Sequence, residues 1–376
     1  MNSPVQFKEH FVGSLPDAYQ VTVADVNGDG KPDIVGLSSG RSEIVWFENP
    51  IWKRHVITTH TKRNIDIALY DIDGKGELAA AVASEFDLGN SKDGGRLQIF
   101  RRGKPLDTEW VGMDFDTVIS SHRIRWADLN GDGHKELVVV PLFGEGAKAP
   151  DYTIPMPLVS YSFEDGKAHR HDIDRSLTMA HGVKILDWYG KGHDDILIAS
   201  FEGVTLYSQT GKGADRKWQK THLGVGEQNE PTKRGSSEVD RGWLPGKKPF
   251  IATIEPWHGH EVVVYLQPKE TGALWERHVI DNTLNDGHGI ACVDLDGDGK
   301  FEIIAGYRGG EHNLYGYRCL DIRGEKWERF TIDAGNMAGS AVKIADINGD
   351  GRPDIVACGS VTGNVKWYEN LGPIKK

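Results

Sequence analysis

Three histidines recur at one position of a repeated pattern in this sequence. His122, His181 and His288 each lie six residues before an acidic residue that opens a polar turn. A neutral imidazole can take a proton near neutral pH, and its ring nitrogens bind divalent metal ions. Because the three share one offset, we expect them to occupy equivalent places in a repeated fold and to meet in one site. Other repeats have Tyr19, Ile65 and Ser340 at this place.

Segments that interrupt the repeat supply further candidate residues. Long irregular loops on a rigid scaffold commonly hold binding and catalytic residues, and four such segments occur at 84–95, 141–157, 255–261 and 306–313. Together with the neighbour of the first histidine, they give the candidates Arg123, Tyr152, Glu255, Trp257, His258, His260, Tyr307 and Arg308. We expect these residues to form one functional site with the three histidines.

Two kinds of chemistry fit this set of residues. In the first, His122 removes a proton next to a carbonyl or carboxylate, and Arg123 or a histidine-bound divalent ion stabilises the enolate. Tyr152 or a second histidine then protonates the leaving oxygen. In the second, His and Glu ligands hold Zn²⁺ or another divalent ion that assists hydrolysis. The sequence has no phosphate-binding loop and no glycosidase-like carboxylate pair, so it favours a lyase.

Four aspartate-rich turns have a spacing typical of calcium ligands. Each places side-chain oxygens at positions 1, 3, 5 and 9, with glycine at 4 and 6, as in the first half of an EF-hand loop. Hydrogen bonds from backbone amides alone can also hold such turns, but the ligand set predicts structural Ca²⁺ in up to four of them. The ligands are Asp25, Asn27, Asp29, Asp33, Asp128, Asn130, Asp132, Glu136, Asp294, Asp296, Asp298, Glu302, Asp346, Asn348, Asp350 and Asp354. Two weaker copies with Lys75 or Lys191 at position 5 are predicted to be metal-free.

These turns belong to a repeat whose first acidic residues are separated by 46 to 59 residues, counting Asp240 in a decayed copy over 238–254. Each unit contains four apolar segments of strand length, which is typical of a propeller blade. Residues 6–12 have the pattern of a fourth strand and are expected to complete the last blade. We therefore predict an all-β protein, a seven-bladed propeller of four-stranded antiparallel blades, forming a single domain over residues 1–376. The turns should lie on one face and the histidines on the other.

The composition excludes several classes of protein. The chain has 44 basic and 55 acidic residues and a formal charge of −11, which disfavours a nucleic acid or an anionic membrane as partner. No apolar run is long enough to span a bilayer, and three cysteines do not form a disulfide framework. The N-terminus does not read as a signal peptide, so we expect either a cytoplasmic location or a trimmed export signal. The sequence does not predict an oligomeric state.

The repeats resemble the FG-GAP/VCBS family of propellers, which implies calcium in the aspartate-rich turns. The pairs His122-Arg123, His258-Gly259 and His288-Gly289 are also similar to the N-terminal propeller of the aldos-2-ulose dehydratase family. That resemblance implies β-elimination on a keto-sugar of the osone or 1,5-anhydrofructose type, with a metal in the propeller. His122 would then be the base, and His181, His258 and His288 would hold substrate or metal. The cupin domains of that family are absent from this sequence, so a second, isomerising step is not implied.

Two alternatives remain beside a carbon–oxygen lyase acting on such a sugar. In a lyase acting on uronate polysaccharides, Arg123 and Arg308 would neutralise the carboxylate, and Tyr152 and Tyr307 would act in proton transfer. In a non-catalytic propeller that binds glycans or proteins, Trp257, Tyr152 and Tyr307 would provide stacking surfaces. A carbohydrate is the expected partner in the first two readings.

Overall fold

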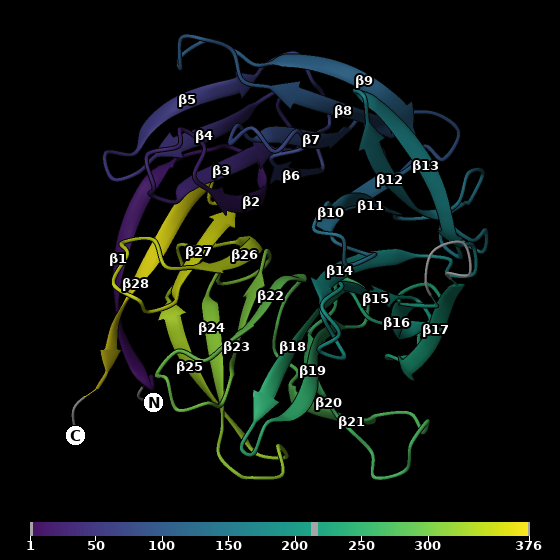
Figure 1. Cartoon of the computed structure of the whole chain (residues 1–376). Coiled ribbons are helices and arrows are strands. Elements are labelled where there is room, and N and C mark those ends of the chain that lie inside the picture. Colours follow the sequence, from purple (N-terminus) through teal and green to yellow (C-terminus); the bar gives the residue numbers. More distant parts are fainter. Residues whose placement is uncertain (1–2, 212–216, 375–376) are drawn as a thin grey trace.

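Seven four-stranded antiparallel sheets make up the computed structural model of this chain, which describes residues 3–211 and 217–374. The sheets are arranged as blades around a common axis, with the first strand of each blade innermost (Figure 1). No helix occurs in the described residues, and hence none that could cross a membrane. The predicted all-β, seven-bladed propeller is confirmed.

The first four blades follow one another along the chain, each built from consecutive strands. Their strands are β2 (Ala18–Ala24), β3 (Asp33–Ser38), β4 (Ile44–Glu48) and β5 (Lys53–Thr58); β6 (Asp66–Tyr70), β7 (Ala79–Ser84), β8 (Arg96–Arg101) and β9 (Val111–Thr117); β10 (Ser121–Ala127), β11 (Glu136–Pro141), β12 (Leu158–Glu164) and β13 (Lys167–Asp174); and β14 (Ala180–Leu186), β15 (Asp195–Ser200), β16 (Gly203–Thr210) and β17 (Lys217–Gly224).

Blades five and six continue this order, and the last blade combines the two ends of the chain. The strands are β18 (Glu238–Leu244), β19 (Lys248–Glu255), β20 (Glu261–Leu266) and β21 (Glu276–Asp281); β22 (Gly287–Val293), β23 (Glu302–Tyr307), β24 (Leu314–Cys319) and β25 (Trp327–Asp333); and β26 (Gly339–Ala345), β27 (Asp354–Gly359), β28 (Asn364–Pro373) and β1 (Val5–Ser14).

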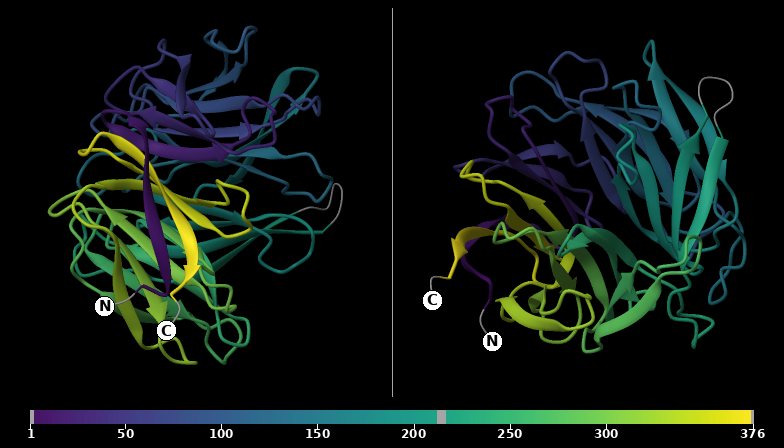
Figure 2. Two further views of the ribbon diagram at one scale, coloured as in Figure 1. Left: turned by 90° about the vertical axis from the view of Figure 1, so that its left-hand side faces the viewer. Right: turned by 60° about the horizontal axis from the view of Figure 1, so that its bottom comes forward.

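The N-terminal strand β1 pairs antiparallel with β28, near the C-terminus, from Val5 opposite Pro373 to Ser14 opposite Asn364. Figure 2 shows these two strands side by side, with the N and C labels close together. The pairing is consistent with the expected role of residues 6–12 as the outer strand of the last blade. It covers what would otherwise be a free edge of β28.

The second strand of each blade forms the centre of the hydrophobic core. Strands β3, β7, β15, β23 and β27 are buried along their whole length. Both faces of these strands pack against neighbouring blades, which explains their nearly continuous apolar sequences. Aliphatic residues such as Ile198 and Val356 therefore hold the blades in fixed positions around the axis.

Blade five departs from the expected repeat. Asp240 is not a turn residue: it lies within β18, where its carboxylate contacts Lys184 Nζ at 2.9 Å and accepts a hydrogen bond from the backbone of Cys292. The turn between β18 and β19 has lost its acidic residue, which is why the nearest aspartate in the sequence was misleading. Ser237, not a residue farther upstream, occupies the histidine position of this blade, because His181 Nδ1 contacts its carbonyl as His288 Nδ1 contacts that of Ser340.

Candidate functional site

A repeated irregularity of the inner strands aims the site residues at the axis. In five blades the pairing of the first and second strands skips one residue, which is the sign of a β-bulge. The skipped residues are Tyr19, His122, His181, His288 and Ser340. A bulge redirects the side chain of its extra residue, so a shared offset in the sequence becomes a shared position beside the axis.

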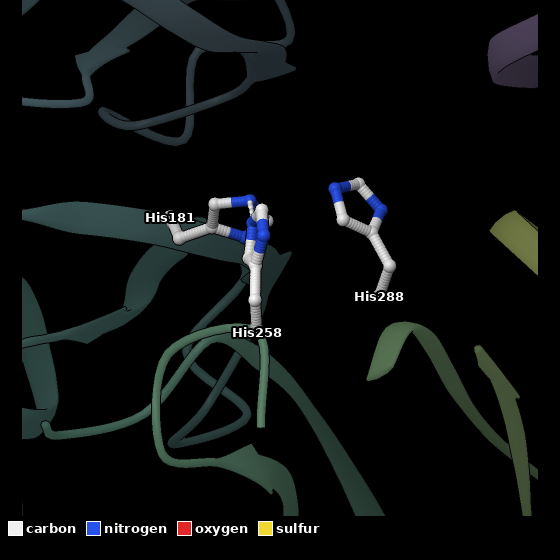
Figure 3. A group of neighbouring side chains, drawn as sticks. All are labelled: His181, His258 and His288. Atoms are coloured by element: carbon white, nitrogen blue, oxygen red, sulfur yellow. Dashed lines mark hydrogen bonds between the residues drawn. The ribbon is translucent and has the colours of Figure 1, made fainter. Parts of the chain in front are cut away.

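The structure brings the three predicted histidines together around His181. The ring centroid of His181 lies 4.6 Å from that of His122 and 4.9 Å from that of His288. His258, from the loop between β19 and β20, adds a fourth ring 4.7 Å from His181. Figure 3 shows His181, His258 and His288 converging from separate elements. The expected convergence of imidazoles from different blades is therefore present.

Backbone carbonyls fix the orientation of two of these rings. His181 Nδ1 lies 3.0 Å from the carbonyl oxygen of Ser237 and 2.9 Å from Glu238 Oε1. His288 Nδ1 lies 2.5 Å from the carbonyl oxygen of Ser340. Since only an N–H can donate to these oxygens, Nδ1 bears the proton in both rings and Nε2 presents a lone pair to the cluster.

Close approach of blades four and five makes the contact with Glu238 possible. Gly182 follows His181 in β14, and a Cβ atom there would lie 2.7 Å from the Cα atom of Glu238. Any other residue at this position would push the two inner strands apart. Glu238 also accepts a hydrogen bond from Arg123 Nη2 at 3.0 Å, so one carboxylate holds both Arg123 and His181.

A tyrosine joins His122 to His288. Tyr19 Oη lies 3.0 Å from His122 Nε2 and 3.1 Å from His288 Nε2. Because His288 Nε2 is unprotonated and can only accept, the Tyr19 hydroxyl donates a hydrogen bond to it. The same hydroxyl accepts a hydrogen bond from His122 Nε2–H. His122 Nδ1 is then unprotonated, and it is buried without a protein hydrogen-bond partner. This nitrogen is the free basic atom of His122.

His258 is held in a left-handed backbone conformation, with φ of 50°, and its ring is bound on both sides. Its Nδ1 accepts a hydrogen bond from Arg308 Nη2 at 2.9 Å, which places the ring proton on Nε2. That Nε2–H donates to His181 Nε2 at 2.9 Å. Arg308 is itself fixed by two hydrogen bonds of 2.9 Å to the carboxylate of Asp286.

The electrostatics of the cluster keep the imidazoles neutral. Burial lowers the pKa of His122, His258 and His288 well below the usual value of 6.5. The charge of Arg123 lowers all three pKa values further, and that of Arg308 lowers those of His258 and His288. Burial alone would raise the pKa of Glu238, but the charge of Arg123 and the hydrogen bond from His181 lower it to about 2. At neutral pH the cluster therefore contains neutral bases beside an ionised carboxylate and two guanidinium groups.

The cluster is covered on most sides. His122, His181, His288 and Arg123 are only 1–2% exposed. The side chains of His258 and Arg308 are 22% and 19% exposed, so they form the solvent-facing side of the group. Arg123 Nη1 and Trp257 Nε1, like His122 Nδ1, are buried polar atoms without a protein partner. Unpaired buried polar atoms are costly, and their presence here favours a bound polar molecule.

The donor set also fits a divalent metal ion. His181, His258 and His288 can each offer one ring nitrogen, all within 4.8 Å of one another. His181 and His288 present Nε2 lone pairs; His258 would present one if its proton moved to Nδ1, where Asp286 Oδ1 lies 3.4 Å away. Three nitrogen ligands backed by carboxylate and carbonyl partners suit Zn²⁺ or a similar ion. A bound ion would act as a Lewis acid toward a carbonyl oxygen.

One of the expected site residues, Glu255, stabilises blade five instead. Glu255 is fully buried, and Ser236, Thr253 and Tyr265 donate hydrogen bonds to its Oε1 atom. Arg277 Nε contacts its Oε2 atom at 2.7 Å. Glu255 thus ties the strands of blade five together, because a buried carboxylate needs several donors.

Among the described residues, Tyr307, Tyr152 and the His260 ring make no direct contact with the four clustered histidines. Tyr307 stacks on Tyr315 within blade six at a centroid distance of 5.7 Å. Tyr152 packs on Phe143 at 5.1 Å in an apolar cluster, and its ring lies 6.4 Å from that of Trp257, which borders this cluster. His260 is exposed at the surface. The roles expected for these three residues, including Tyr152 as the acid, are not supported by their contacts.

Trp257 and Arg308, by contrast, adjoin the cluster through His258. The Trp257 ring lies 4.7 Å from that of His258. Three residues that the sequence reading did not assign also belong here: Tyr19, Glu238 and Asp286. Tyr19 lies at the same six-residue offset as the histidines and could have been found by it. No feature of the repeat pointed to Glu238 or Asp286. Blade five lacks the acidic turn residue from which the offset of Glu238 could be counted, and Asp286 lies in a loop outside the repeated strands.

The aspartate-rich turns have the shape that their spacing predicts. In the first, Asp25 accepts hydrogen bonds from the amides of Gly28, Asp29 and Gly30, and the two glycines have φ values of 80° and 84°. Asp71 and Asp187 of the two lysine-containing copies accept equivalent bonds. Backbone amides thus hold the turn with or without an ion, and Ca²⁺ in the four acidic turns stays a prediction.

The turn at Asp294 is the best-formed candidate for calcium. Asp294, Asp296 and Glu302 can place carboxylate oxygens within 4.8 Å of one another. Burial, together with the nearby acidic groups Asp296, Asp298 and Asp294, raises the pKa of Glu302 to about 8. Uncompensated carboxylates in this arrangement favour a hard cation with oxygen ligands.

Comparison with known proteins agrees with the repeat and with a propeller fold. The family described as "Aldos-2-ulose dehydratase, beta-propeller domain" matches residues 94–270, and "FG-GAP repeat" matches residues 18–36. Aldos-2-ulose dehydratase of Phanerodontia chrysosporium is 24% identical over 401 residues, which cover 89% of this chain and 43% of that protein. The resemblance to this dehydratase propeller is confirmed. The chain spans less than half the length of that relative.

Two further similarities concern smaller segments or the fold alone. Integrin alpha-6 of Gallus gallus is 33% identical over 125 residues, or 30% of this chain and 12% of that protein. The crystal structure of the exotype rhamnogalacturonan lyase YesX superposes with a TM-score of 0.50 at 14% identity, covering 97% of this chain and 73% of that one. At this level of identity the second similarity shows the propeller fold.

Proposed function

We propose that this propeller is a carbohydrate-active lyase or dehydratase that catalyses β-elimination on a keto-sugar of the osone or 1,5-anhydrofructose type. One observation supports this most. His122 and Arg123 are consecutive residues, and the Nδ1 atom of the first and the Nη1 atom of the second are both buried without a protein hydrogen-bond partner. A neutral base beside a cationic donor is what proton removal next to a carbonyl requires. The similarity to aldos-2-ulose dehydratase indicates the substrate class.

In this proposal His122 removes the proton next to the sugar carbonyl. Its Nε2–H is held by Tyr19, so the ring is oriented with Nδ1 available, and its low pKa keeps it unprotonated. The imidazolium that forms would be stabilised through its hydrogen bond to Tyr19, and when no ion occupies the histidines His288 Nε2 can take the tyrosine proton. The leaving hydroxyl would then receive a proton from this network.

The negative charge of the enolate would be stabilised by guanidinium groups or by a histidine-bound ion. Arg123 is fixed by Glu238, and Arg308 by Asp286, so both cations are oriented before substrate binds. His181, His258 and His288 are the residues that would hold a divalent ion. Since His122 is only 2% exposed, the proposal requires surrounding side chains to move when the sugar enters. His258 and Arg308, on the solvent-facing side of the cluster, are candidates for that movement.

The experiment is to incubate candidate keto-sugars with the wild-type chain and with His122→Ala, and to follow the ultraviolet absorbance of a conjugated enone. His171→Ala is a matched control, because His171 is exposed on β13 of the same blade. We expect product with the wild type and the control, and a rate lower by about a hundredfold or more with His122→Ala. Equal rates for all three proteins would remove His122 from the mechanism.

The same experiment separates the alternatives. A uronate lyase would act on uronate-containing polysaccharides, releasing unsaturated uronates, and not on free keto-sugars. Tyr152 and Tyr307 would not be its direct proton donors, since neither contacts the histidines. A non-catalytic glycan-binding propeller would form no product with any sugar or metal but would bind a glycan in calorimetry.

A further inference from the structure

A second polar compartment lies on the propeller axis, on the turn side of the histidine cluster. It has a volume of about 420 Å³ and is lined by residues from the inner strands of all seven blades, β2, β6, β10, β14, β18, β22 and β26. The histidine cluster is at the start of these strands, whereas this cavity follows their middle parts. The proposed lyase chemistry makes no use of it.

One layer of this cavity is rich in cations. The position three residues after the histidine position is occupied by Arg125, Lys184 and Lys343 in three blades, and all three line the cavity. Asp240 occupies the equivalent position in blade five. Because the blades are related by the repeat, these side chains lie at one level around the axis. Charged residues that point into a narrow channel raise the local potential strongly.

Two of the cations have carboxylate partners. Arg125 Nη1 contacts Asp66 Oδ2 at 2.5 Å, and Lys184 Nζ contacts Asp240 Oδ1 at 2.9 Å. Glu238, which also lines the cavity, is already bound to Arg123 and His181. Each of these carboxylates in the cavity therefore already has a cationic or imidazole partner.

Lys343 differs from the other two. Within residues 3–211 and 217–374, no carboxylate oxygen lies within 4.0 Å of its Nζ, and the side chain makes no hydrogen bond to protein. Burial, followed by the charge of Arg125, lowers its pKa to about 8. An ammonium group in a partly desolvated channel without a counter-ion is unfavourable, and an anion beside it would offset that cost.

We propose that the axial cavity binds a small carboxylate anion through Lys343. Arg125 and Lys184, on the neighbouring strands β10 and β14, lie across the axis from Lys343 on β26 as additional cations. The three cations together exceed the two carboxylates Asp66 and Asp240 by one positive charge, which matches a monoanion. The walls also include Ala68 and Ala291, which occupy the same position as Lys343 in their own blades, so the short carbon chain of a carboxylate has apolar contacts there. An inorganic anion would use the cations but not these walls. The proposal does not depend on the lyase activity of the histidine cluster.

The test is calorimetric titration of the full chain with sodium acetate at constant ionic strength, with sodium chloride and sodium phosphate as comparison titrations. We expect saturable acetate binding to the wild type, at one site per chain. Lys343→Met should weaken this binding by about tenfold or more, since a charged hydrogen bond is lost. Lys248→Met, at an exposed position of β19, is the matched control and should bind acetate as the wild type does.

Several outcomes would overturn the proposal. Absence of acetate binding to the wild type, or equal binding by Lys343→Met, would remove the site. Chloride or phosphate binding that is as tight as acetate binding would identify an inorganic anion and overturn the carboxylate assignment. If Lys343→Met does not fold, a wild-type crystal soaked in trichloroacetate, which does not alkylate thiols, decides when its diffraction is measured at long wavelength: anomalous chlorine density beside Lys343 supports the site, and its absence from the axial cavity contradicts it.

Discussion

The hydroxyl oxygen of Tyr19 lies 3.0 Å from His122 Nε2, although the two residues are 103 positions apart in the sequence. They come from the inner strands of blades one and three and meet at the axis because each is the extra residue of a β-bulge. This contact fixes the tautomer of His122 and leaves its other nitrogen free. It therefore connects the repeat of the fold to the proposed base.

Tyr19→Phe should remove the hydrogen bond that orients His122 while leaving the fold intact. The ring of Tyr19 would remain, but His122 Nε2 and His288 Nε2 would lose their shared partner, at a cost of about 1–3 kcal/mol in the free energy of unfolding. We expect the rate of keto-sugar elimination to fall by about tenfold or more. Tyr189→Phe, at a residue that is 46% exposed, is the control. An unchanged rate for Tyr19→Phe would exclude the hydroxyl from proton transfer.

Glu238 should make stability depend on pH in acid. Its pKa in the folded chain is about 2, against an ordinary value of 4.5. Because the folded pKa is the lower one, the stabilisation is complete above pH 4.5 and is lost as the pH falls toward 2. The shift corresponds to about 3 kcal/mol.

Urea unfolding of the wild type and of Glu238→Gln at several pH values measures this contribution. At pH 7 the variant should be less stable by roughly 3 kcal/mol, since Arg123 and His181 lose their carboxylate. The difference between the two proteins should shrink below pH 4. A difference that is independent of pH would contradict the assignment of Glu238 as the ionised partner.

A divalent ion at the histidines should be detectable without any substrate. We expect Zn²⁺ to bind at one site per chain in calorimetry, with His288→Ala or His181→Ala weakening it by more than about tenfold. The low pKa values of these imidazoles mean that protons compete little with the metal down to mildly acidic pH. His171→Ala is again the control. Equal Zn²⁺ affinity in His288→Ala would show that the ion binds elsewhere.

Calcium should act on the opposite face. Adding Ca²⁺ after chelation should raise the melting temperature, and Glu302→Gln should reduce that rise, because Glu302 closes the turn at Asp294. Asp71→Asn, in a turn with Lys75 at position 5, should leave the calcium effect unchanged. A calcium effect of the same size in Glu302→Gln and the wild type would mean that this turn is held by its backbone hydrogen bonds alone.

The repeat made much of this architecture predictable, because the turn spacing and the strand periodicity are local properties. The offset of His122, His181 and His288 from the turns was sufficient to place them together. The same offset placed Tyr19 beside them, but a phenol among imidazoles was read as a break in the pattern. Blade five was misread at Asp240 because its turn has lost the acidic residue that marks the others.

The loop residues were predicted least well, because their side-chain directions depend on contacts that the sequence does not display. Glu255 lies three residues before His258, yet Arg277 and Tyr265 hold its carboxylate inside the blade. Tyr152 was expected near the histidines, but Phe143 and neighbouring apolar side chains hold it elsewhere. Arg308 contacts the cluster because hydrogen bonds to Asp286 orient its guanidinium group. Asp286 lies outside the repeat, so its role could not be predicted from the repeat.

The most direct test of the central claim follows the proton next to the sugar carbonyl. The keto-sugar is incubated in D₂O with the wild type, His122→Ala or His171→Ala, and proton NMR measures loss of that signal together with appearance of the vinyl proton of the product. The account predicts both changes for the wild type and for His171→Ala, and neither for His122→Ala at comparable enzyme concentrations. Loss of the proton at an undiminished rate with a correctly folded His122→Ala would contradict it.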